Sequence, residues 1–168
     1  MLEEFQVGSR LDINMGEFWS GITVLWPNVN LRRTVKLASS IAHINGQQVV
    51  GGESFTAEPE SGKWQQYPFS MKTDGAWAFT QGLNRFYFHR FVHQPHPTAR
   101  PGMTMGPWGV HFDRTNTWWE PGQAWLTYIA RCQYLLQQGE PVGDLLYCTD
   151  DKDFTNTLIP ERSAVPPP

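Results

Sequence analysis

Patterns typical of strands and of helices alternate along this chain, and that alternation constrains its fold more than any other feature. The strand-like runs are short and apolar or aromatic, and they span 15–19, 47–55, 84–92 and 142–149. The helical runs carry apolar residues at helical spacing, and they span 31–45, 68–81 and 118–138. Alternation at this spacing predicts an α/β fold in which helices pack against a parallel sheet. A further short strand is expected at 5–7.

Local signals mark the ends of the predicted helices. Pro68 suits the first turn of the second helix, and Gly46 and Gly82 follow the ends of the first and the second. Thr117 followed by Glu120 matches a capping box, which predicts that the third helix begins at 118.

The length of the chain limits how much of a closed barrel it can form. A complete (β/α)8 barrel needs roughly 250 residues, and this chain has 168. We therefore expect a partial (β/α)8 TIM barrel over 1–155 and a Pro-rich, disordered tail over 156–168, with an open α/β sheet as the alternative. Part of a barrel leaves two sheet edges unpaired, which predicts self-association. The sequence contains neither of the Gly-rich phosphate-binding motifs, so nucleotide-binding sheets lose support.

Composition excludes several classes of partner. The net charge is -3, so we expect no nucleic-acid partner, and no apolar run is long enough to span a membrane. We expect no signal peptide at this end of the sequence, because Met1 is followed by Leu-Glu-Glu with no basic start and no apolar core. Cys132 and Cys148 are interpreted as buried apolar residues, and no organic cofactor is expected. The 8 tryptophans and a charged fraction of only 17% fit a chain that stacks rings on sugars, or simply one with a large core.

Candidate chemistry lies at the ends of the predicted strands. In GGESFT, Glu53 follows two glycines, which suggests a bend or a close approach where the acid is presented. Polar groups end the other strands as well, namely Glu17, His89 with His93, and Asp150 with Asp151. In a parallel barrel these ends converge on one face.

Converging carboxylates and imidazoles among aromatic residues suit glycoside hydrolysis. That reaction uses one protonated carboxyl at the leaving oxygen and one carboxylate that activates water or attacks carbon. Each group also has a structural interpretation: Glu17 as a solvated acid, Glu53 as a structural acid, and His89 as a core histidine. Glu120 has a capping role. The acids near 150 could hold a hard cation, but they lack EF-hand spacing, and the histidine spacing argues against zinc.

Several long strings resemble the catalytic domain of glycoside hydrolase family 106, the α-L-rhamnosidases. They are MGEFW (15–19), ASSIAHINGQ (38–47), GGESFT (51–56), GLNRFYFHRFVHQP (82–95), PGMTMGPWGVHFDRTNTWW (101–119) and YIARCQYLLQQG (128–139). They follow the order and spacing of the family over most of the chain, here the C-terminal part of the catalytic barrel.

The resemblance implies a barrel that hydrolyses terminal α-L-rhamnosides of plant polysaccharides or glycoconjugates, with inversion and with a calcium ion. It makes Glu53 the leading general-acid candidate and Glu17 a second acid of the site. It also suggests an exported bacterial enzyme whose partner is a rhamnose-containing oligo- or polysaccharide. The substrate-binding candidates are Trp19, His89, His93, Trp108, His111, Trp118 and Trp119.

The chain also departs from the family pattern. The family carries a Gly-Glu pair after the last strand, where this chain has Thr149-Asp150-Asp151, so Asp151 is the nearest counterpart of that glutamate. Family members are several times longer. Two alternatives therefore stay open: a carbohydrate-binding remnant without a working acid/base pair, and an unrelated α/β scaffold whose aromatic residues form only a core.

Overall fold

The computed structural model describes residues 4–21 and 31–146. In chain order the elements are α1 (Glu4–Gly8), β1 (Asn14–Trp19), α2 (Leu31–Ile44), β2 (Val50–Thr56), α3 (Pro68–Thr80), β3 (Arg85–Phe88) and α4 (Gln123–Leu136). The strands form one sheet in the order β1-β2-β3, and both neighbouring pairs are parallel. The alternation of the sequence is thus confirmed as a mixed α/β fold with a parallel sheet.

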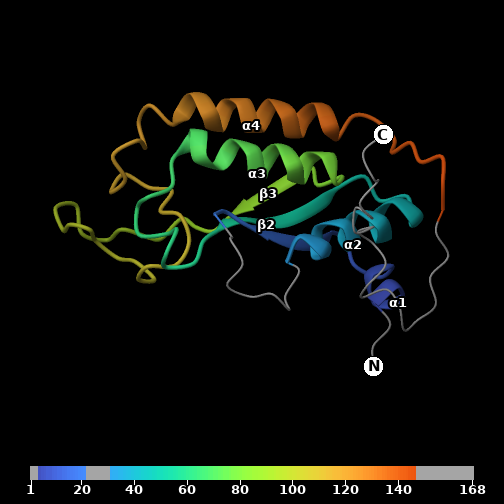
Figure 1. The fold of residues 1–168 in the computed structure, drawn as a ribbon, viewed down its shortest axis with the longest axis horizontal. Coiled ribbons are helices and arrows are strands. Elements are labelled where there is room, and N and C mark those ends of the chain that lie inside the picture. Colours follow the sequence, from blue (N-terminus) through green and yellow to red (C-terminus); the bar gives the residue numbers. More distant parts are fainter. Residues whose placement is uncertain (1–3, 22–30, 147–168) are drawn as a thin grey trace, which may run out of the picture.

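The four helices do not share the two faces of the sheet equally. Gly16 lies against α2, where an added Cβ would be 2.5 Å from the Thr34 carbonyl, and α3 and α4 contribute buried residues over the same face. Figure 1 shows α3 and α4 running side by side on one side of the strands. The opposite face presents Met15 and Tyr87, which are 49% and 39% exposed. One face is therefore packed and the other is open.

An aromatic core fills the packed face. Phe55 of β2 is fully buried, and its ring lies 4.9 Å from that of Phe18, 5.4 Å from that of Phe86 and 5.4 Å from that of Trp125. Edge-to-face pairs at these separations are favourable beyond the area that they bury. The core joins all three strands to α4.

Two predicted helix ends are confirmed, because glycine permits the left-handed backbone that ends each helix. Gly46 has φ 68° and follows α2, where the N–H of Gln47 donates to the carbonyl of Ala42. Gly82 has φ 96° and follows α3. No helix among the described residues is long and apolar enough to cross a membrane.

Three local predictions are wrong within the described residues. Residues 5–7 belong to a helix, whose last residue, Gly8, packs closely on Ile41 of α2 and accepts a hydrogen bond from Asn14 of β1. The last helix begins at Gln123 and not at 118, since Pro121 disfavours helical backbone in Glu120, and no side-chain cap forms at its start. β3 is also shorter than predicted.

The predicted strand at 142–149 is absent over 142–146, and 147–149 lie outside the described residues. The outer edge of β3, where a fourth strand would pair, is contacted by a glutamine of α4 and by the glutamine that caps the end of α4. The N–H of Phe86 donates to Gln133 Oε1 at 2.6 Å, and Gln137 Nε2 donates to the carbonyl of Asn84 at 2.7 Å. These groups are therefore not free to pair with another strand, and self-association stays a prediction.

Candidate active site

Two glutamates lie next to each other on the open face of the sheet. In the β1–β2 register Glu17 is opposite Glu53, and Glu53 is in turn opposite Tyr87 of β3. Side chains alternate along a strand, so Glu17 points away from the face on which its neighbour Phe18 is buried. Neighbouring strands lie about 4.8 Å apart. The sheet therefore brings the two sequence-predicted acids together, although each lies in the middle of its strand and not at the predicted strand end.

Glu53 is held by a residue of its own strand. The hydroxyl of Thr56, a residue that is only 3% exposed, donates to Glu53 Oε1 at 2.6 Å. Among the described residues no other hydrogen bond to this carboxylate is formed. A short bond from a hydroxyl to a carboxylate restrains the Glu53 side chain.

His89 lies one residue beyond β3 and faces the two acids. Burial lowers the pKa of His89 below its ordinary value, an effect that the negative charge of Glu53 and, less strongly, of Glu17 opposes. The neighbouring Arg90 cation lowers the same pKa. A neutral imidazole beside two carboxylates can donate one hydrogen bond and accept another. The structure thus places His89 with the glutamates, as the sequence predicts.

A buried cation follows His89 directly. Arg90 is 9% exposed, and none of its three guanidinium nitrogens has a hydrogen-bond partner among the described residues. Its backbone pairs with 110–112: its N–H donates to the carbonyl of Val110, and its carbonyl accepts from Phe112. This is the parallel pattern, and it makes His111 the cross-strand neighbour of Arg90.

His111 lies in the interior, not on the surface of a cleft. Only 1% of it is exposed, and its ring stacks on that of Trp64 with centroids 3.9 Å apart. Burial, and then the Arg90 charge, lower the pKa of His111. Its predicted contact with substrate stays a prediction.

The predicted tryptophans separate into two groups. Trp19 ends β1 and meets Trp108 edge to face at 6.2 Å, and Trp108 is 41% exposed, so this pair borders the open side. Trp118 and Trp119 instead pack against the aromatic core, and Trp118 Nε1 donates to the carbonyl of Gln66 at 2.8 Å. The second pair is partly buried and has a structural role, and its part in sugar binding stays a prediction.

The remaining candidates are not assembled with the glutamates. His93 is exposed in the connection that follows β3, and Asp151 lies outside the described residues. Within 4–21 and 31–146, no three His, Cys, Asp or Glu side chains are grouped so as to hold one metal ion. The calcium ion therefore stays a prediction, and no step proposed below uses one.

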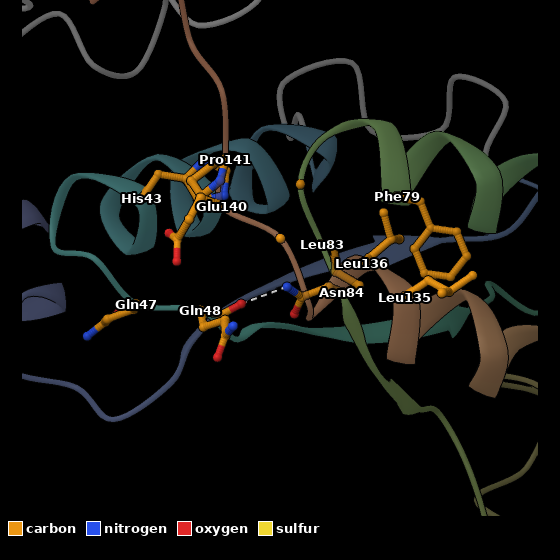
Figure 2. Close-up of a pocket in the computed structure, with 12 residues that line it drawn as sticks. His43, Gln47, Gln48, Phe79, Leu83, Asn84, Leu135, Leu136, Glu140 and Pro141 are labelled. Atoms are coloured by element: carbon orange, nitrogen blue, oxygen red, sulfur yellow. Dashed lines mark hydrogen bonds between the residues drawn. The ribbon is translucent and has the colours of Figure 1, made fainter.

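A cavity of about 280 Å³ lies at the other end of the strands. Figure 2 shows His43 of α2, Phe79 of α3 and Leu135 of α4 around it, with Asn84 donating to the Gln48 carbonyl at 2.7 Å. Asn84 and Gln48 precede β3 and β2, so this cavity opens at the amino ends of the strands. It carries none of the predicted catalytic groups.

Sequence reasoning missed Thr56 and Arg90. Residues three apart in a regular strand point to opposite faces, so the spacing of Glu53 and Thr56 gives no reason to pair them. In the sequence Arg90 stands among aromatic residues. Nothing in that pattern predicts that its guanidinium is buried without a hydrogen-bond partner among the described residues.

Parallel strands that carry two adjacent carboxylates on an open face, with an imidazole after the third strand and the exposed Trp108 beside Trp19, form a site of the kind that glycoside hydrolases use. The comparisons agree with this class. The family model described as alpha-L-rhamnosidase, Glyco_hydro_106, matches residues 1–168. The chain therefore belongs to family 106 of the glycoside hydrolases.

Two similar proteins carry different names, and the solved structure agrees with the family. The rhamnosidase from Novosphingobium sp. PP1Y has a structure that matches 81% of this chain and 13% of its own, with a TM-score of 0.73 and 34% identity. A Formosa agariphila protein with the name "Putative beta-glucuronidase" is 43% identical over 160 residues, which are 95% of this chain and 13% of that protein. The chain thus spans about 13% of the length of either protein.

Proposed function

We propose that the open face of the sheet forms part of the active site of an enzyme that removes terminal α-L-rhamnose from plant polysaccharides or glycoconjugates, with inversion. The observation that carries the proposal is the register of Glu17 beside Glu53 on the open face of two parallel strands, two and three residues before the strands end. The family model and the rhamnosidase neighbour support the sugar. The proposal applies to the intact natural protein and not to this chain alone.

The open face fits the inside of a barrel. Its two exposed apolar side chains, Met15 and Tyr87, flank Gly51, where an added Cβ would lie 2.7 Å from Met15 Cγ. All helices of the core pack on the other face, as they do on the outside of a (β/α)8 barrel. We infer that β1, β2 and β3 are consecutive strands of such a barrel and that the remaining strands are supplied by other parts of the intact protein.

In the proposed reaction Glu53 is the general acid. Its proton, carried on Oε2, passes to the glycosidic oxygen as the bond from that oxygen to C1 of rhamnose breaks. Water attacks C1 from the opposite face and loses a proton to a second carboxylate. The product is rhamnose of inverted configuration together with the released alcohol.

The second carboxylate has to stand farther away than Glu17. An inverting pair needs roughly 6.5–9.5 Å between its carboxyl groups, whereas adjacent strands are about 4.8 Å apart. We therefore assign Glu17 to orientation of the sugar hydroxyls and place the base outside the described residues, where Asp151 stays the candidate. His89, held neutral by burial, suits a hydrogen bond to another hydroxyl.

The test is hydrolysis of 4-nitrophenyl α-L-rhamnoside by the intact protein and by its Glu53→Gln variant. Loss of a general acid costs about 10²- to 10⁴-fold in rate. Glu60→Gln is the matched control, because Glu60 is an exposed acid in the loop after β2 and should lose nothing. Proton NMR of the first sugar released reports inversion.

Two results would contradict the proposal. If the intact protein cleaves a 4-nitrophenyl β-glucuronide in preference to the rhamnoside, the proposed substrate is wrong. The activity would then be the one that the name of the Formosa relative gives. Rhamnose binding without turnover, by folded protein, would favour the carbohydrate-binding remnant, for which the exposed Trp108 beside Trp19 would supply the stacking surface.

A further inference from the structure

We propose that Thr56 is the positioning residue of Glu53 and that an irregular backbone at Phe55 exists to bring the two together. Only the expected effect on catalysis rests on the proposed function. The positioning itself follows from contacts within β2.

The register shows where the irregularity lies. Phe18 pairs with Ser54, but the next residue, Trp19, pairs with Thr56, so β2 contains one residue more than β1 at this point. The extra residue is Phe55, whose φ of 64° is in the left-handed region. This is the pattern of a bulge.

The bulge changes which side chains share a face. In a regular strand Thr56 would lie on the opposite face from Glu53, because they are three residues apart. The extra residue shifts the alternation by one position, so Thr56 lies on the same face as Glu53. The Thr56 hydroxyl is then 2.6 Å from Glu53 Oε1. Without the bulge this hydrogen bond cannot form.

The protein keeps this backbone although the residue is not glycine. A left-handed conformation is unfavourable for phenylalanine, because its Cβ comes too close to the following carbonyl oxygen. The Phe55 ring is fully buried against Phe18, Phe86 and Trp125, and α3 approaches so closely that a Cβ on Gly75 would lie 3.1 Å from it. Core packing thus holds the conformation that points Thr56 at Glu53.

The hydrogen bond assigns different roles to the two carboxylate oxygens. Thr56 occupies Oε1 from a buried position, while Oε2 has no hydrogen-bond partner among the described residues. Only Oε2 is therefore available to hold a proton and deliver it to a glycosidic oxygen. Fixing this orientation keeps the acid aligned with the bond that it protonates.

The test compares Thr56→Val, which removes the hydroxyl but keeps the shape, with Thr56→Ser, which keeps the hydroxyl. The first measurement is a crystal structure of each form of the intact protein. We expect the Glu53 carboxylate to rotate or to occupy several conformers in Thr56→Val and to keep its wild-type position in Thr56→Ser. A Glu53 side chain that is unchanged in Thr56→Val would overturn the inference, whether or not the protein is active.

The second measurement is kinetic. On the rhamnoside, kcat of Thr56→Val should fall on the order of 10- to 100-fold, as expected when a catalytic group is misplaced by about 1 Å. KM should stay within about twofold, because the loss is confined to the transition state, and Thr56→Ser should recover most of kcat. Equal kcat values for wild type and Thr56→Val would overturn the inference. An inactive wild type would instead refute the proposed function and leave the crystal structures to decide on positioning.

Discussion

The two faces of this sheet are built from the same three strands, yet they differ in almost every physical respect. The face under the helices is dry and aromatic, with Phe18, Phe55 and Phe86 almost completely buried. The other face carries Glu17 and Glu53 and leaves Met15 and Tyr87 exposed. The packed face therefore stabilises the fold, and the open face carries the candidate catalytic groups. The bulge at Phe55 links the two, because burial of the Phe55 ring on the packed face positions Thr56 beside Glu53 on the open face.

The largest effect expected from this contrast is on stability. Phe55→Ala removes a fully buried ring that contacts all three strands and α4, and it should lower the free energy of unfolding by about 3–5 kcal/mol. Tyr87→Ala is the control on the open face, where the side chain is 39% exposed, and it should cost less than about 1 kcal/mol. Urea unfolding of this chain measures both, and equal losses would refute the distinction between the faces.

An intermediate effect is expected at the junction after β3. Arg90 is buried without a partner for its guanidinium among the described residues, so its replacement by methionine should raise the free energy of unfolding by about 1–4 kcal/mol. Arg85→Met, at an exposed position of β3, should change it by less than about 0.5 kcal/mol. Strong destabilisation of Arg90→Met would mean that the guanidinium has an anionic partner in solution.

The smallest effect concerns pH. Burial lowers the pKa of His43, His89 and His111 from an ordinary value of 6.5. The unfolded chain therefore binds more protons than the folded chain between the lowered values and 6.5, so stability rises with pH across that interval and levels off above it. Urea midpoints measured from pH 5 to 8 should show this, with a smaller slope in His89→Gln. A flat or falling profile would contradict the burial of these rings.

Much of the fold was predictable because local patterns and tertiary structure agree. α2 and α3 carry apolar residues at helical spacing and end two residues before Gly46 and Gly82, and each has a strand before it and after it. The prediction failed where a neighbour decided the outcome. Residues 5–7 became helical against α2, and 142–146 formed no strand where a glutamine of α4 and the glutamine that caps its end contact the edge of β3.

For the candidate site, the family, the two glutamates and the strands that carry them were predictable, because these depend on residue identity and on alternation along the chain. Three facts needed the folded structure: Glu17 and Glu53 are direct neighbours, His111 is interior, and Thr56 holds Glu53. These facts depend on register and on a bulge at a phenylalanine, and a register is set by how the faces pack, not by any one strand.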